Sequence, residues 1–323
     1  MMKRLLFVPV ILLALCSLGF GQDLAQQLQD VSVTVKAGRS EGSGVLITRN
    51  VKTTGDKIEK INFVWTAGHV IDNLRSVRTI IREGKPIQVV EFKDVQIVQE
   101  LVEQGRRVGE IKMDAKVLKF SHSENGEDLA LLMVRKKNFV DNNAVFLSSD
   151  EPVSIGQELY HVGSLLGQQG SNSMTRGIMS QIGRVLNLGS GDGVIFDQTT
   201  VTAFPGSSGG GVFLTERSKD DAGKYVGMLV RGAGETFNFI VPVRRMRKWA
   251  REQNVLWALD VKESTPSYAA ILKLPIEGSS EGAQAKGETK ALTKDSQTFP
   301  VLIHRPKVDN KEYYLKTGLL DFH

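Results

Sequence analysis

Short apolar or alternating runs, separated by turn-forming residues, dominate the chain between residues 28 and 243. Runs of this kind, spaced by Gly-rich turns, are typical of the strands of an antiparallel barrel or sandwich. The predicted strands cover 31–35, 45–48, 61–66, 77–81, 117–120, 130–134, 158–162, 194–198, 212–214, 225–230 and 237–241. We therefore expect an all-β body.

One clear helical pattern follows these strands. From Val243 to about Trp257 the apolar residues Met246, Trp249 and Val255 fall on one side and Arg and Lys on the other, which predicts an amphipathic helix. A second helix is possible around Gln26, and residues 95–104 fit a strand or a helix.

The first residues have the pattern of an export signal. Lys3 and Arg4 precede an uncharged run, 5–18, and Gly19-Phe20-Gly21 supplies small residues for cleavage. The uncharged run is shorter than the roughly 20 residues of a membrane-spanning helix, so we predict a signal peptide over 1–21 rather than an anchor. Lipidation at Cys16 is a weaker alternative, because Leu15 stands where a small residue is needed. The mature chain is expected in the periplasm or outside the cell, with no stable membrane span.

The end of the chain loses the strand pattern. Residues 277–296 are small, polar and charged, which indicates a linker. Residues 299–320 contain some apolar positions but are too few for a core, so this stretch is expected to dock on the body or to stay mobile. The predicted organisation is a signal peptide (1–21), one domain (22–257) and a linker with a tail (258–323).

Composition narrows the function classes. With 41 Lys and Arg against 36 Asp and Glu, the formal charge is +5, too small to argue for nucleic-acid binding. A single cysteine excludes an intramolecular disulfide, so packing alone must stabilise the fold. The histidines show no metal-ligand spacing, and no cofactor or metal is implied.

The strongest chemical signal is the run Pro205–Gly211, PGSSGGG. A nucleophilic serine needs an accessible hydroxyl and backbone N–H groups aimed at a developing oxyanion, and flanking glycines allow both. We predict Ser208 as the nucleophile and the amides of Gly206 and Ser208 as the oxyanion hole. Ser207 competes for the role but lacks the following Gly-Gly, and a plain Gly/Ser loop is the simpler alternative.

A serine nucleophile requires a histidine base with an acid behind it. His69 ends an apolar strand in the run TAGH, and Asp128 opens the buried strand DLALL. We predict these two residues as base and acid. Asp114 is a fallback for the acid, although its neighbours Lys112 and Lys116 suggest a solvated charged face. The other four histidines, His122, His161, His304 and His323, are expected to be structural.

The order His69, Asp128, Ser208, with the contexts TAGH, DLALL and GSSGG, resembles trypsin-like serine proteases of the chymotrypsin fold, and bacterial Deg/HtrA proteases most. Further similar segments are 42–47, 155–167, 175–180, 227–230 and 239–242. The resemblance covers about residues 28–257 and implies two antiparallel six-stranded β-barrels with the triad between them and a C-terminal helix outside.

The resemblance also implies an activity. It indicates a serine endopeptidase that cuts polypeptides at unfolded or exposed segments through an acyl-enzyme. By alignment Thr202, Val230, Gly232 and Asn238 edge the substrate pocket. Because Thr202 replaces the acid of Lys/Arg-specific relatives, a basic P1 residue is not expected. Asn238 narrows the pocket, which favours small or medium aliphatic P1 residues.

Two departures from the family stand out. His69 and Asp128 are 59 positions apart, and residues 82–107 have the look of an inserted hairpin or helix near the active site. The 66 residues after 257 are too few for the PDZ module that many Deg/HtrA proteins carry, so the oligomeric state is left open.

The sequence leaves two other classes of protein to consider. The run GSSG also begins like the nucleophile elbow of an α/β-hydrolase, but that fold places its acid and histidine after the serine. A catalytically latent binding or chaperone module with a protease fold is the main alternative, although no predicted triad residue is substituted.

Overall fold

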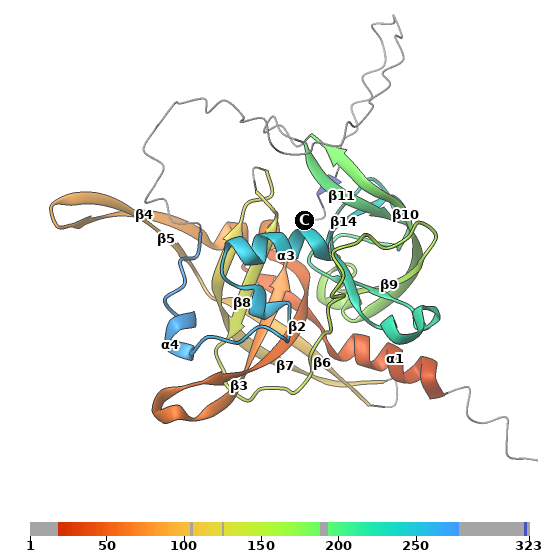
Figure 1. Cartoon of the computed structure of the whole chain (residues 1–323), viewed down its shortest axis with the longest axis horizontal. Helices are drawn as coiled ribbons and strands as arrows, with labels where there is room; N and C mark the ends of the chain where they lie inside the picture. Colours follow the sequence, from red (N-terminus) through yellow and green to blue (C-terminus); the bar gives the residue numbers. More distant parts are fainter. Residues whose placement is uncertain (1–18, 104–105, 125, 188–192, 278–319, 322–323) are drawn as a thin grey trace, which may run out of the picture.

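The body of the molecule consists of two β-rings side by side, with short helices on the outside (Figure 1). It is known from a computed structural model that describes residues 19–103, 106–124, 126–187, 193–277 and 320–321. The expected architecture, mostly β with two six-stranded antiparallel rings, is confirmed.

The first ring is a closed barrel in the order β1-β2-β3-β8-β7-β6. Its strands are β1 (Ser32–Ala37), β2 (Ser40–Lys52), β3 (Ile58–Thr66), β6 (Val95–Glu103), β7 (Arg106–Ser121) and β8 (Leu129–Val134). Residues 95–103 of the ambiguous stretch thus form a strand. It pairs with both β1 and β7, and this pairing closes the barrel and buries Val95 and Ile97.

The second ring follows the order β12-β9-β10-β11-β14-β13, and a further pairing of β12 with β13 closes it. Its strands are β9 (Glu158–Gly163), β10 (Ser173–Leu186), β11 (Val194–Thr199), β12 (Gly211–Leu214), β13 (Tyr225–Gly232) and β14 (Asn238–Pro242). A short strand, β15 (Leu320–Asp321), adds to β13.

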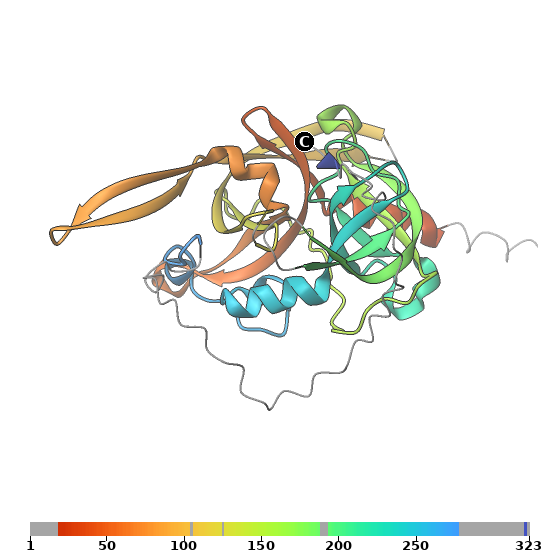
Figure 2. The ribbon, with the colours of Figure 1, turned by 90° about the horizontal axis from the view of Figure 1, so that it is seen from above.

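Helix α3 (Val243–Glu252) covers the outside of the first barrel and crosses from one ring to the other (Figure 2). Its Trp249 packs edge-on against Trp65 of β3, with ring centroids 6.1 Å apart, and the Trp65 indole Nε1 donates to the carbonyl of Ala258 at 3.1 Å. Strand β3 is therefore buried on both faces from Ile61 to Thr66, which explains its continuous apolar run.

The predicted helix 243–257 is too long. α3 ends at Glu252, and Asn254 adopts a left-handed backbone with φ of 57°. Asn tolerates this conformation better than most residues and commonly terminates helices. The apolar pattern continues past the break because the 3₁₀ turn Leu256–Ala258 also packs on the core.

The predicted insertion 82–107 is wrong as a unit. A protruding hairpin begins earlier, with β4 (Arg75–Arg82) and β5 (Lys85–Phe92), and residues 95–103 of the stretch form barrel strand β6. Glu83 and Gly84 form its two-residue turn, both with positive φ, as such turns require. Figure 1 and Figure 2 both show the hairpin extending away from the barrel.

Two helices flank the body. α1 (Gly19–Asp30) accounts for the helix expected around Gln26, and α4 (Tyr268–Ile271) packs Ile271 into the first barrel's core. Within the described ranges, no helix has the length and apolar character needed to cross a bilayer. Most of the predicted signal peptide, all but one residue of the linker 277–296, and His304 and His323 lie outside the described residues.

Candidate active site

The Ser208 loop, residues 205–210, connects β11 to β12 between the two rings. Gly206 and Gly209 have positive φ of 93° and 87°. A Cβ at Gly206 would lie 2.3 Å from the Ser164 carbonyl oxygen, and one at Gly209 only 2.1 Å from that of Ser43. Glycine is therefore required at both positions for conformation and for space.

Backbone hydrogen bonds hold this loop from both rings. From the first barrel, the Ser43 amide donates to the Ser208 carbonyl at 2.7 Å. From the second, the Leu229 carbonyl of β13 accepts from the Gly209 amide at 2.8 Å. The position of Ser208 thus depends on the contact between the two rings.

The two neighbouring serines differ in their surroundings. The Ser207 Oγ accepts a hydrogen bond from the Phe204 amide at 3.1 Å, so this hydroxyl stabilises the turn. The amides of Ser207, Gly209 and Gly210 all donate to backbone carbonyls, which excludes them as donors to a substrate oxyanion. These contacts make Ser207 a structural residue.

Strand pairing brings His69 and Asp128 together. Thr66 of β3 lies opposite Ala130 of β8, so the residue three positions after Thr66 meets the residue two positions before Ala130. The His69 Nδ1 is 3.0 Å from Asp128 Oδ2, and the His69 amide donates to Asp128 Oδ1 at 3.0 Å. The 59-residue separation in sequence therefore has no effect on the geometry.

The Asp128 carboxylate is almost completely buried, with 1% of the residue exposed. Burial by itself would raise the pKa of Asp128. The charge of His69, its side-chain and backbone hydrogen bonds, and the charge of Arg231 together outweigh burial and lower that pKa below its ordinary value. Asp128 is therefore ionised at neutral pH and oriented by His69.

The Ser208 loop packs directly against the segment that carries His69. A Cβ at Gly209 would lie 2.4 Å from Thr66 Oγ1 and 3.0 Å from the Ala67 amide nitrogen. His69 follows Ala67 by two positions and lies in the single-turn helix α2 (Gly68–Ile71). Three separate stretches of the chain thus bring the three predicted residues to the boundary between the rings.

The predicted pocket residues lie on the second ring. Gly232 and Asn238 are register partners on β13 and β14, and the Asn238 amide donates to the carbonyls of Val201 and Glu235 at 2.7 and 2.8 Å. Val201 precedes Thr202, so Thr202, Gly232 and Asn238 are neighbours. Val230 is fully buried. Nothing in the sequence indicated that the charge of Arg231, which stands between Val230 and Gly232 at the predicted pocket edge, also acts on Asp128.

The histidines and the acid that were set aside behave as structural residues. The ring of His122 stacks edge-on on Phe120, and Asp114 is exposed on β7. His161 is fully buried behind the Ser208 loop, where its Nδ1 lies 3.0 Å from the Gly211 carbonyl oxygen. Burial lowers the pKa of His161 to about 4, although the hydrogen bond to Gly211 opposes this shift.

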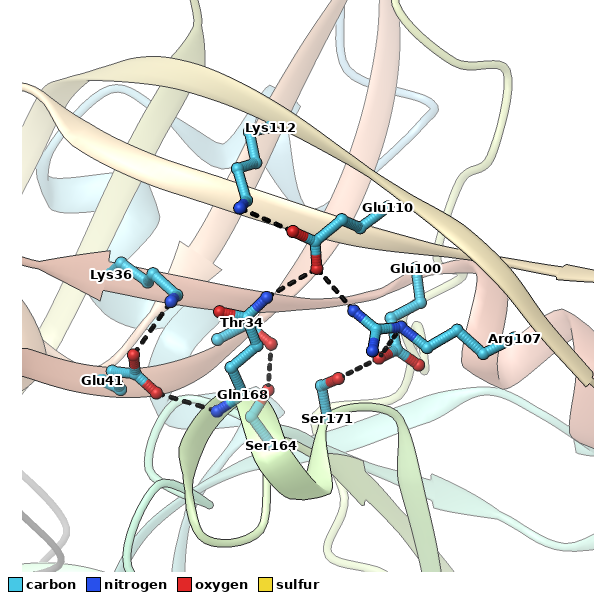
Figure 3. A network of polar contacts seen from close by, with 10 residues as sticks. All are labelled: Thr34, Lys36, Glu41, Glu100, Arg107, Glu110, Lys112, Ser164, Gln168 and Ser171. Carbon is cyan, nitrogen blue, oxygen red and sulfur yellow. Dashed lines mark hydrogen bonds and ion pairs between the residues drawn. The ribbon is translucent and has the colours of Figure 1, made fainter.

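A polar network at the ring boundary also escaped sequence reasoning (Figure 3). It holds the turn η3 (Gly167–Gly170), which lies against Gly206. The Gln168 amide donates to Glu41 of β2 at 2.8 Å, and its side chain donates to Glu110 of β7 at 2.6 Å. The Gly206 side of the loop is therefore supported from the first barrel, through contacts 58 and 127 residues apart in sequence.

Comparison with known proteins agrees with this geometry. The Trypsin-like peptidase domain family matches residues 42–228, more than half of the chain. The chain belongs to this family. The matched region contains all three predicted triad residues, and the resemblance to trypsin-like proteases is confirmed.

A curated relative of the chain is the serine protease Do-like HtrA of Lactobacillus helveticus. It is 27% identical over 189 residues, which cover 58% of this chain and 35% of the relative. The chain therefore aligns with about a third of that protein's length.

Solved structures similar to this chain include Deg5 and the MamO protease domain from Magnetospirillum magneticum. Deg5 is 20% identical, with a TM-score of 0.47, over 74% of this chain and 95% of Deg5. The MamO domain is 16% identical, with a TM-score of 0.46, over 69% of this chain and 97% of that domain.

Proposed function

We propose that the chain is an exported serine endopeptidase whose catalytic triad is His69, Asp128 and Ser208. The observation that carries the proposal is the buried His69–Asp128 pair, at 3.0 Å, beside a loop whose glycines are required by space and conformation. A neutral imidazole held by an ionised carboxylate is the base that a serine nucleophile needs.

In the first half of the reaction, His69 takes the proton of the Ser208 hydroxyl as its oxygen attacks a peptide carbonyl. The amides of Gly206 and Ser208 donate to the resulting oxyanion. His69 then gives its proton to the leaving amine, the peptide C–N bond breaks, and an acyl-enzyme remains.

In the second half, water attacks the acyl carbonyl while His69 accepts its proton. The ester bond to Ser208 breaks, the proton returns to the Ser208 oxygen, and the carboxylic acid product leaves. Asp128 stays ionised throughout and stabilises the imidazolium form of His69. The lowered pKa of Asp128 favours this ionised state.

Substrate selection belongs to the second ring in this proposal. Thr202, Val230, Gly232 and Asn238 border the P1 pocket, and Asn238 reduces its depth because its side chain is anchored to two carbonyls there. No carboxylate is among these four residues. Small or medium aliphatic P1 residues, in unfolded or exposed polypeptide segments, are the expected substrates.

Export completes the proposal. The signal sequence 1–21 would be removed, leaving a protease domain over 22–257 in the periplasm or the medium, followed by residues 258–323. The support is the charge and apolar pattern of the first 21 residues.

The test is digestion of casein by residues 22–323 and by the matched Ser208→Ala variant, with cut sites read by mass spectrometry. We expect cleavage by the parent only, with a loss of about 10⁴- to 10⁶-fold in the variant. A fluorophosphonate should label the parent at Ser208 alone. Cleavage by both proteins would overturn the triad, and neither cleavage nor labelling would favour a latent binding module.

A further inference from the structure

The short strand β15 occupies a distinctive place on the second ring. Leu320 and Asp321 pair antiparallel with Gly232 and Arg231 at the end of β13 (Figure 2). Of these two partners, Gly232 is a predicted pocket residue and Arg231 directly precedes it. A segment far away in sequence therefore reaches the candidate active site.

The edge of β13 changes partner along its length. Its first part pairs with β12, up to Met228 opposite Gly211. The next residue, Leu229, exchanges backbone hydrogen bonds with the loop instead, through the Gly210 carbonyl and the Gly209 amide. Beyond Leu229 the edge continues as Val230–Gly232, which we call the acceptor edge, and it begins beside Ser208.

An acceptor edge of this kind binds extended polypeptide through main-chain hydrogen bonds. In the proposed function, the substrate must be extended near Ser208 so that one peptide carbonyl meets the nucleophile. The acceptor edge can hold it there, because this edge continues directly from Leu229, which is hydrogen-bonded to the Ser208 loop. β15 therefore lies on backbone groups that an extended substrate would use.

The direction of β15 also matches that of a polypeptide entering the site. Leu320 faces Gly232, and the following residue faces Arg231. Increasing residue number along β15 thus runs toward Val230 and Leu229, and so toward Ser208. A chain with this polarity presents its carboxyl-terminal side to the nucleophile.

We propose that the segment containing β15 binds the acceptor edge in cis and competes there with polypeptide substrates. The inhibitory effect rests on the proposed protease function, whereas the binding of the segment to the acceptor edge is independent of that function. The 42 residues between Glu277 and Leu320 can span up to about 140 Å when fully extended.

Tethering makes even weak pairing effective. A tethered segment reaches an effective concentration of order 1 mM. With a Kd of about 100 µM, the ratio of occupied to unoccupied acceptor edge would be about ten. Hydrolysis by the intact chain should then be about tenfold below that of a chain whose segment cannot pair.

The first experiment compares two variants of residues 22–323 in hydrolysis of a fluorogenic peptide. Leu320→Pro with Asp321→Pro removes two backbone N–H groups and prevents strand pairing. Leu320→Ala with Asp321→Ala keeps the backbone and serves as the matched control. We expect about tenfold faster hydrolysis for the proline variant only, and a ratio that is independent of protein concentration.

Equal rates for the two variants would overturn the inference. A ratio that grows with protein concentration would overturn the cis arrangement, because a second copy would then supply the segment.

A second experiment separates this inference from the proposed function. A fluorescein-labelled peptide of residues 315–323 is titrated with the proline variant that also carries Ser208→Ala, and anisotropy is recorded. We expect saturable binding with a Kd near 100 µM, and none for the peptide with prolines at 320 and 321. Binding without any hydrolysis by the proline variant that retains Ser208 would refute only the protease function, whereas hydrolysis by that variant without binding would refute only the inference.

Discussion

The two sides of the Ser208 loop each place a histidine near it, yet the Nδ1 atoms of the two histidines have different chemical partners. On the first-barrel side, His69 pairs with the ionised Asp128 at 3.0 Å. On the second-ring side, His161 meets only the Gly211 carbonyl at 3.0 Å, and its Nε2 has no hydrogen-bond partner among the described residues.

The difference shows how partners decide what a histidine can do. A carboxylate favours the imidazolium form, so His69 can accept a proton during a reaction. Burial without a carboxylate disfavours the charged form, so His161 stays neutral and acts as a rigid hydrogen-bonding spacer. The serines repeat this contrast, because Ser207 is bonded to its own turn.

The largest expected effect comes from removing the feature that distinguishes His69. Asp128→Asn should lower kcat by about 10⁴-fold, as in other triads, because the amide supports the wrong imidazole tautomer. The measurement is kcat for a fluorogenic peptide. Urea unfolding of the same variant checks that the fold survives, and a loss under tenfold would show that His69 needs no carboxylate.

The second prediction concerns acid stability on the opposite side. The pKa of His161 is 6.5 in the unfolded chain and about 4 in the folded one. Between these values the unfolded chain binds a proton and the folded chain does not, so stability falls as pH decreases from 6.5 toward 4. This residue alone should remove about 2 kcal/mol of unfolding free energy between pH 7 and pH 5.

His161→Asn tests this, because it removes the titration and keeps a donor for Gly211. Urea unfolding of parent and variant at pH 7 and pH 5 gives the difference between the two losses. Other titrating groups cancel in the comparison. Equal acid sensitivity in both proteins would mean that His161 does not resist protonation in the folded state.

Much of the fold could be predicted from sequence because apolar alternation reports burial directly. The strands 61–66 and 130–134 were located within a few residues, since each is buried along its whole length. The run 95–104 was ambiguous, because only its pairing with β1 and β7 selects the strand. The helix end at Glu252 and the start of the hairpin at Arg75 depended on local backbone conformation and exposure.

The residues of the candidate site could be predicted from the sequence, but the contacts that hold them in place could not. Motif contexts named His69, Asp128 and Ser208, and strand register places the first two in contact; their catalytic roles stay a prediction. The contacts of Gln168 with Glu41 and Glu110 join distant segments, and no local pattern marks such pairs. Arg231 near Asp128 was missed for the same reason.

The smallest expected effect sharpens the comparison between the serines. Ser207→Ala removes the acceptor of the Phe204 amide, which should cost about 1 kcal/mol of unfolding free energy. Hydrolysis should stay within about tenfold of the parent, because the nucleophile and its base are untouched, and fluorophosphonate labelling should persist. If Ser207→Ala abolished labelling and Ser208→Ala retained it, the nucleophile would be Ser207. The Ser207 hydroxyl, which accepts from the Phe204 amide, would then have to turn toward the ring boundary during the reaction.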